Sequence, residues 1–527
     1  MAAVDAVRAS ANDGGASDNG RDGGMDMLTI LQFGAASISL LERMLAEGRL
    51  PTLAALRERG VWHNLETPAT HFAGGAFHTL YSGTEITDHG LVFPFQWSAS
   101  DQRVRYTTAF DAPPPVWEQL AERGMGLHTL ALDPYESRPP RTAPAGTVVS
   151  GWQFTNRVVL QPWSSPPEAR DRLKRLFGPP AAVEDVFGRS STRDLLRWRR
   201  DLLAASGRAA DAATLLLAGD RFDLTWVTFS APHIAGHQLW DLSQIDEDLD
   251  DATRRVLASA LEEVYQTVDA AFDRVLAALP DDADVIVVSP VGMEVNTSRT
   301  DLLPAMLDAV LLGRARPDSG AGWVWKLRAA VPTGLRARVA AALPTRVALE
   351  LTARLESRGQ DWNSTRAFAQ PADNQGYVRL NLCGRERDGI VAPAEAESLM
   401  DEIATGLLTF RDPDGTASVK SVERVTDTFG TGAHADRLPD LIVRWSERPA
   451  TRLGYVQSER FGTVRRQGSG SGRSGNHTAD AWALVVPGAS RARTPTRPPR
   501  LVDVAATAAA LAGGGIADLP GEPLLER

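Results

Sequence analysis

Short apolar runs alternate along the chain with longer stretches in which apolar residues recur at helical spacing. The apolar runs predict buried strands at Met27–Phe33, Leu127–Leu132, Leu224–Phe229, Val285–Ser289, Leu441–Trp445 and Ala483–Val486. The helical spacing predicts helices at about Ser39–Gly48, Thr52–Arg59, Val116–Glu122, Thr192–Ala213, Ala252–Leu279 and Ala394–Thr409. Strands that alternate with helices predict an α/β fold with a mostly parallel sheet, covered by helices on both faces.

Two segments interrupt this alternation. Residues 1–25 are rich in Ala, Gly, Asp and Ser and are predicted to be a disordered tail. Residues 300–365 are rich in Ala, Arg, Leu and Pro, carry few strand signals and are predicted to be a helical insertion or cap. The core is then expected in two parts, 26–299 and 366–490, with a linker and a C-terminal helix at 491–527.

The composition narrows the possible classes of function. With 527 residues and 43% hydrophobic content, the chain is long and apolar enough to bury a large core. Its net charge is −10, from 56 Lys and Arg against 66 Asp and Glu. This balance argues against broad contact with nucleic-acid phosphates, but it leaves room for a small phosphorylated molecule held by a few local cations.

The cysteine content and the apolar runs bear on the compartment. Cys383 is the only cysteine, so no internal disulfide can form, which fits a reducing compartment. We find neither an apolar run suited to a signal peptide nor one of about 18 residues that could span a membrane. The expected location is therefore the cytoplasm, without membrane contact.

Five stretches follow one another along the chain, at Leu45–Leu53, Leu80–Gly83 with Asp88–Gly90, Arg366–Glu386 with Gly376–Leu382 inside it, Leu438–Trp445, and Gly472–Thr478 with Ala483–Gly488. In this order they resemble motifs of the type I phosphodiesterase/nucleotide pyrophosphatase branch, sulfatase-like, of the alkaline phosphatase superfamily. The resemblance spans about 27–490 and implies the α/β fold of that superfamily.

The resemblance also implies a chemistry, in which two metal ions and a Thr or Ser nucleophile cleave phosphate or sulfate esters. Two cations can clamp the attacking and leaving oxygens, and Asp and His are suitable ligands. In this chain Phe33 stands at the position of the first-strand aspartate, Ala73 at the nucleophile, and Pro290 and Val291 at an Asp-His pair. None of these four residues can ligate a metal ion or attack an ester, so one metal site is expected to be degenerate.

The other metal site of the family maps onto three histidines. His233 and His237 follow a predicted strand at positions i and i+4, which places both imidazoles on one face of a helix, and His477 lies in the last motif. His233 stands where the family has an aspartate. Three imidazoles suit one zinc ion with an open fourth position, so the expected cofactor is one zinc per chain.

Further residues are candidates for the same site. Thr70 and His71 lie close to the nucleophile position and are catalytic candidates, with loop residues over the sheet as the alternative. His78 and Arg473 are candidates for contact with an anionic substrate. Asp241, four positions after the second histidine, is a candidate to orient a ligating imidazole from behind, with an ordinary helix-surface carboxylate as the alternative.

Three functions remain open from the sequence. The first is a hydrolase-family protein with a single-metal, three-histidine site that acts on a small phosphate, sulfate or other ester. The second is a catalytically inactive pseudoenzyme that binds a ligand or partner in the old pocket. The third, an ordinary two-metal enzyme, needs Asp ligands that the sequence does not offer. The expected partner is a small-molecule ester or anionic ligand, with no nucleic acid.

Overall fold

The computed structural model describes residues 27–135, 137–154, 162–181, 183, 190–245, 247–316, 361–467, 470–513 and 518–527. The predicted disordered tail at 1–25 and most of the predicted insertion, residues 317–360, lie outside the described residues. Most of the segments 26–299 and 366–490, the two expected parts of the core, are among the described residues.

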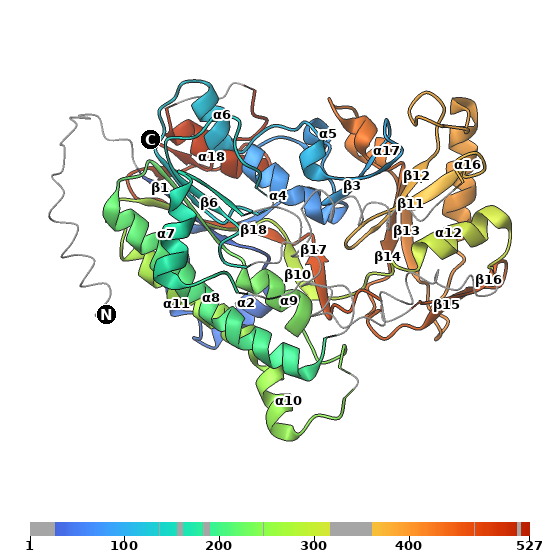
Figure 1. Cartoon of the computed structure of the whole chain (residues 1–527), viewed down its shortest axis with the longest axis horizontal. Coiled ribbons are helices and arrows are strands. Elements are labelled where there is room, and N and C mark those ends of the chain that lie inside the picture. Colours follow the sequence, from blue (N-terminus) through green and yellow to red (C-terminus); the bar gives the residue numbers. More distant parts are fainter. Residues whose placement is uncertain are drawn as a thin grey trace.

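An eight-stranded sheet forms the centre of the larger body of the molecule (Figure 1). Its strand order is β2-β18-β9-β1-β8-β5-β6-β7. The bounds are β1 Leu28–Phe33, β2 Val61–Leu65, β5 Thr129–Leu132, β6 Gly146–Ser150, β7 Trp163–Ser165, β8 Leu224–Phe229, β9 Asp284–Ser289 and β18 Ala481–Val486. The run from β9 to β6 is parallel throughout, whereas β18 is antiparallel to β9 and the outermost strands β2 and β7 are antiparallel to their neighbours. The predicted mostly parallel sheet is confirmed.

Helices cover both faces of this sheet because its strands are apolar on both sides. On one face, side chains such as Leu31 and Phe229 pack against α2 Ile38–Ala46, α3 Pro51–Arg59, α7 Glu168–Phe177, α8 Thr192–Gly219, α9 Ala231–Leu239 and α11 Ala260–Leu276. On the other, side chains such as Ile30 and Trp226 pack against α4 Ala73–Ser82, α6 Val116–Glu122 and α18 Val502–Leu511. The C-terminal helix thus lies on a face of the sheet.

The single helix predicted over Ala252–Leu279 is wrong at one point. The segment forms two helices, α10 Asp251–Ala258 and α11 Ala260–Leu276, which meet at Ser259. The Ser259 hydroxyl bonds Glu263 Oε1 at 2.8 Å and lies 3.3 Å from the Val256 carbonyl oxygen. Serine hydroxyls compete in this way with the helical hydrogen bonds of the backbone. The spacing of apolar residues carries no information about this competition, so it could not predict the break.

A second sheet has its own apolar cluster. Its strands are antiparallel, in the order β11 Ala367–Gln370, β12 Gly376–Leu380, β14 Leu441–Trp445 and β13 Val419–Arg424. Helices α12 Leu303–Leu312 and α16 Pro393–Leu407 pack against it through residues such as Met306 and Ile403. Leu441–Trp445 is therefore a strand as predicted, but it belongs to this second sheet and not to the parallel one.

A two-stranded ribbon lies between the two sheets (Figure 1). It pairs β10 Gly292–Val295, which follows β9, with β17 Gly475–Thr478, which precedes β18. β10 therefore continues from the carboxyl end of β9, and β17 leads into β18 at the same end of the strands. In parallel α/β sheets, ligands bind beyond the carboxyl ends of the strands.

None of the described helices is both long and apolar enough to cross a lipid bilayer.

Glu118 on α6 gives the fold a testable pH dependence. Its residue is only 2% exposed, and burial raises the pKa of its carboxyl from 4.5 to about 7. Because the folded state holds this proton more tightly than the unfolded chain, Glu118 lowers stability progressively as the pH rises from about 4.5 to about 7, by about 3 kcal/mol in total. The free energy of unfolding of Glu118→Gln minus that of the wild type should therefore be larger at pH 8 than at pH 5.

Thermal or urea unfolding at the two pH values measures this change. The exposed Glu122 lies one turn further along α6, so Glu122→Gln is the matched control. A stability difference between Glu118→Gln and the wild type that is the same at both pH values contradicts the prediction.

Candidate metal centre

Helix α9 begins directly after β8 and carries two of the three histidines. Pro232 occupies its first turn, where the missing N–H costs no hydrogen bond. His233 and His237 lie one turn apart on the same face of the helix, and both are almost fully buried. The two histidines therefore lie beyond the carboxyl end of the central strand β8, beside β10 and β17.

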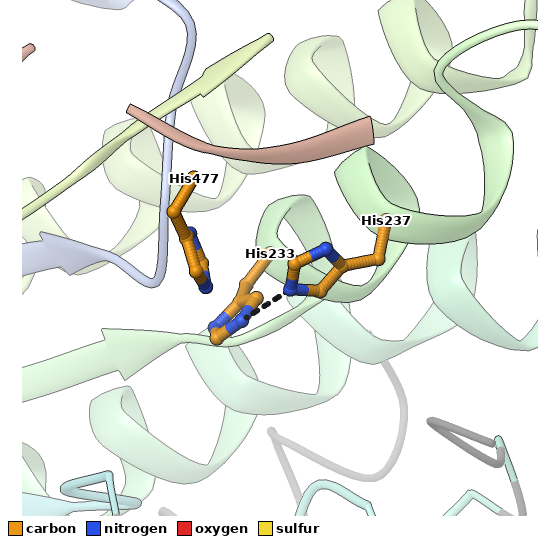
Figure 2. Close-up of side chains that lie close together, drawn as sticks. All are labelled: His233, His237 and His477. Atoms are coloured by element: carbon orange, nitrogen blue, oxygen red, sulfur yellow. Dashed lines mark hydrogen bonds between the residues drawn. The ribbon is translucent and has the colours of Figure 1, made fainter. Parts of the chain in front are cut away.

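A close backbone contact brings the third histidine to the same place. A Cβ atom on Gly475 of β17 would lie 2.2 Å from the carbonyl oxygen of Gly236 on α9, so only glycine permits this approach. His477 follows two residues later and pairs with Met293 of β10. Its ring points toward those of His233 and His237 (Figure 2), with ring centroids 4.8 Å and 4.7 Å apart, respectively.

The three imidazoles have the geometry of a metal site. Their candidate ligand atoms all lie within 4.8 Å of one another, and within the described residues they form the one such group of three or more His, Cys, Asp or Glu. The Nε2 atoms of His233 and His237 are 3.1 Å apart. Two imidazole nitrogens on one tetrahedral zinc ion are separated by about 3.3 Å, so this pair needs little movement to share an ion.

Hydrogen bonding and burial also place His237 in the form that a metal requires. Its Nδ1 atom donates to the carbonyl oxygen of Gly475 at 3.0 Å, which leaves the lone pair on Nε2, the atom that faces His233. Burial holds the pKa of His237 well below its usual value, and the positive charge of Arg473 lowers it further. The imidazole is therefore neutral at physiological pH, as a metal ligand must be.

Aromatic rings form one wall of the centre. Phe77 of α4 stacks on His233 with ring centroids 5.8 Å apart and an interplanar angle of 9°. Tyr135 lies 5.4 Å from the same imidazole and 4.1 Å from Phe77. This wall restricts access of water to the imidazoles from the side of α4.

The four residues predicted to stand at the second metal position and its nucleophile offer no side-chain ligand for a cation. Phe33 turns into the core, where its ring packs on Tyr265, Phe272 and Trp482 with centroid distances of 5.9, 5.1 and 5.7 Å. Val291 is fully buried in an apolar cluster with Ala35, Ala76, Phe77 and Met293. Pro290 accepts a hydrogen bond on its carbonyl from Thr67, and Ala73 is a buried residue at the start of α4. Methyl groups and rings occupy the place where carboxylates would be needed.

Thr70 and His71 are directed to other partners. They lie at the end of the short helix η1 Pro68–Thr70, where the Thr70 hydroxyl is 3.5 Å from the Thr67 carbonyl oxygen. The His71 Nε2 atom bonds Glu423 Oε2 of the second sheet at 2.8 Å. Burial lowers the pKa of His71, and the bond to Glu423 partly offsets this. The hydrogen bond of His71 thus joins the segment before α4 to the second sheet, and its catalytic role remains a prediction.

The remaining candidates differ in position. His78 lines a shallow cleft together with Ser82, Tyr135 and Arg138, and Tyr135 connects that cleft with the aromatic wall. Asp241 accepts a hydrogen bond from the Ser243 amide at 2.7 Å, whereas the partner that orients His237 is the Gly475 carbonyl. Arg473 lies beside the centre, as its effect on the pKa of His237 indicates.

Asp373 was missed by the sequence analysis. It lies in the loop between β11 and β12, its Oδ2 atom is 3.4 Å from His477 Nε2, and its Oδ1 atom pairs with Arg473. The sequence of this loop indicates only a polar turn before a strand, and Asp373 is about a hundred residues from His477 along the chain. No local spacing could reveal the contact, because a separate sheet makes it.

The α/β sheet is covered on both faces, and the imidazoles gather beyond the carboxyl ends of its parallel strands, where proteins of this architecture bind ligands. The model of the type I phosphodiesterase/nucleotide pyrophosphatase family matches residues 29–455, and the chain belongs to this family. The match covers His233 and His237 and ends before His477. No curated protein matches the chain.

Two solved structures are similar to this chain at low sequence identity. Phosphonoacetate hydrolase from Sinorhizobium meliloti 1021, in complex with phosphonoacetate, has a TM-score of 0.51 and 12% identity over 93% of this chain and 96% of its own. Murine ectonucleotide pyrophosphatase/phosphodiesterase 5 has a TM-score of 0.48 and 11% identity over 95% of this chain and 100% of its own. The first similarity agrees with the alkaline-phosphatase-like fold.

Metal content provides a direct test of the three-histidine centre. Protein purified without chelators should hold about one zinc per chain, and His233→Ala should lose it, because two imidazoles hold zinc far more weakly than three. Elemental analysis measures both values. His128 directly precedes β5, at the end of the strands opposite to the three histidines, and stacks on Phe222. His128→Ala is therefore the control and should retain the metal. Equal zinc in all three proteins contradicts the assignment.

Proposed function

We propose that this member of the family binds one zinc ion through His233, His237 and His477 and hydrolyses a small phosphate, sulfate or other ester. The observation that carries the proposal is the contrast between the two metal positions of the scaffold. Three buried imidazoles converge at one of them, whereas Phe33 and Val291 belong to apolar packing at the other. A two-metal mechanism therefore has no support from the residues present.

The donor set suits zinc, which accepts imidazole nitrogen readily and tolerates a site of three protein ligands. Zinc in such a site supplies a Lewis acid that polarises an ester oxygen and lowers the pKa of water beside it. The chain's own residues supply the setting. The Gly475 carbonyl fixes the His237 tautomer, and Phe77 and Tyr135 limit the access of bulk water.

Arg473 determines the class of substrate in this proposal. Its residue is 8% exposed, and its guanidinium pairs with Asp373, whose other oxygen lies 3.4 Å from His477 Nε2, so an anionic group at the centre would compete with that carboxylate for it. A guanidinium binds the paired oxygens of phosphate, phosphonate, sulfate or carboxylate. Phosphonoacetate, the ligand of the phosphonoacetate hydrolase structure, is a small anion of this kind. A cytoplasmic location remains a prediction.

A pseudoenzyme is the second candidate, and a specific observation favours it. Ala73 stands at the nucleophile position, and His71, the nearby candidate base, bonds Glu423 of the second sheet. A pocket that kept its metal and its arginine but had lost its nucleophile could still bind an anion. Turnover separates the two candidates, because both predict ligand binding and only the first predicts product.

The test is hydrolysis by zinc-loaded protein across aryl phosphate, phosphate diester, sulfate and carboxyl esters. If the chain is a single-metal hydrolase, at least one class should be turned over, and His477→Ala should lower kcat/KM at least about 100-fold, because it removes a metal ligand. His128→Ala should stay at the wild-type value. Stoichiometric zinc with no turnover of any class favours the pseudoenzyme.

A further inference from the structure

A cleft lies beside the aromatic wall of the metal centre, where α4 meets the loop after β5. Its lining includes Tyr81 of α4, the proline run 113–115, and Tyr135, Ser137 and Arg138 of the loop. The Tyr135 backbone N–H donates to the Tyr81 hydroxyl at 2.8 Å, which fixes the loop on the helix. Because β5 runs parallel to β8, the cleft lies beyond the same ends of the strands as the three imidazoles, where ligands bind in sheets of this kind.

Ser137 brings to the cleft a buried hydroxyl that has no hydrogen-bond partner among the described residues. The residue is 7% exposed, and its carbonyl accepts a hydrogen bond from Trp163 Nε1 at 3.0 Å, so its backbone is held in place. Buried polar groups are nearly always paired, and one that is left unpaired costs stability. A bound molecule that accepts a hydrogen bond from this hydroxyl would remove that cost.

Arg138 brings a positive charge to the same cleft. The residue is half-buried, and its Nη2 atom donates to the Ala112 carbonyl at 2.9 Å, while Nη1 lies 3.4 Å from the Phe110 carbonyl. These carbonyl groups orient the side chain without neutralising its charge. Because a guanidinium has five N–H donors, those that remain can bind the paired oxygens of an anion.

The size of the cleft limits the size of that anion. Its volume is about 50 Å³, in a measure by which one water molecule needs about 10–15 Å³, so it holds about four non-hydrogen atoms. A carboxylate with one attached carbon has this size. Phosphate is larger, and its higher charge is less suited to walls that include the rings of Tyr81, Tyr135 and the prolines. No Asp or Glu is among the described residues of the lining, so none of them repels a carboxylate.

We propose that this cleft binds a small carboxylate, held by the Arg138 guanidinium and the Ser137 hydroxyl. The site goes beyond the proposed function and needs no zinc. Tyr135 lines the cleft and also lies 5.4 Å from the His233 ring, so a carboxylate bound here is separated from the metal centre by one aromatic side chain. The carboxylate either belongs to the molecule whose ester group reaches the metal centre or is a separate small molecule, and the cleft recognises the same chemistry in both cases.

The test is calorimetric titration of the full-length, metal-free protein with propionate. The wild type should bind it with a Kd on the order of 1 mM, as suits so small a ligand. Arg138→Gln should weaken binding at least about tenfold, because it removes the charge and the paired donors. Propionamide, which has the same shape and no charge, should bind the wild type at least about tenfold more weakly than propionate.

Arg141→Gln is the matched control. It makes the same change of charge three residues further along, where the arginine pairs with the exposed Asp111, and it should leave the affinity for propionate unchanged.

Ser137→Ala keeps the proposal testable if Arg138→Gln disturbs the loop. It should weaken propionate binding about threefold through the loss of one hydrogen bond. Without propionate, its Tm should equal or exceed that of the wild type, because the variant removes a buried hydroxyl that has no partner. A serine that only supports the fold would instead lower the Tm and leave the affinity for propionate unchanged.

A probe with two anionic groups distinguishes the sources of the carboxylate. If the carboxylate is part of the substrate, 4-phosphonobutyrate should bind zinc-loaded protein at least about tenfold more tightly than propionate, and Arg138→Gln should remove this gain. If it is a separate molecule, both probes should bind the cleft equally well. A wild type that binds no propionate overturns the proposal, as does equal binding by the wild type and Arg138→Gln. Failure of the protein to bind zinc overturns only the proposed function.

Discussion

The site depends on the close contact between α9 and β17. Gly475 allows the strand to pass so near to the carbonyl of Gly236 that no other residue fits there. The same glycine accepts the hydrogen bond from His237 Nδ1, so one backbone contact sets both the position of the strand and the tautomer of the imidazole. His477 reaches the centre only because the strand is held in this place.

The residues predicted to stand at the second metal position of the family belong to the apolar packing of the fold. Phe33 and Val291 are not merely unable to ligate; they take part in the two apolar clusters that cover the faces of the main sheet. Burial of such side chains stabilises the fold by roughly 1.5–3 kcal/mol each. Carboxylates at these two positions would place unpaired charge in an apolar interior.

The second sheet reaches the main body near the site through two different contacts. Glu423 on β13 holds His71, and the loop between β11 and β12 holds His477 through Asn374 and Asp373. Each contact joins a polar group of the second sheet to a histidine of the main body. The second sheet is thus positioned to affect the chemistry of the centre, although its own core, with residues such as Val378 and Val443, is separate.

The sequence alone determined the elements and the class of fold, because apolar periodicity is a local property that each strand and helix carries within its own residues. It also determined the pairing of His233 and His237, since a spacing of four residues on a helix fixes a shared face. Only the tertiary structure decided that Leu441–Trp445 belongs to the second sheet, because an apolar run is equally suited to either. Only the tertiary structure brought Asp373 to His477, since their contact depends on how two sheets pack across about a hundred residues of chain.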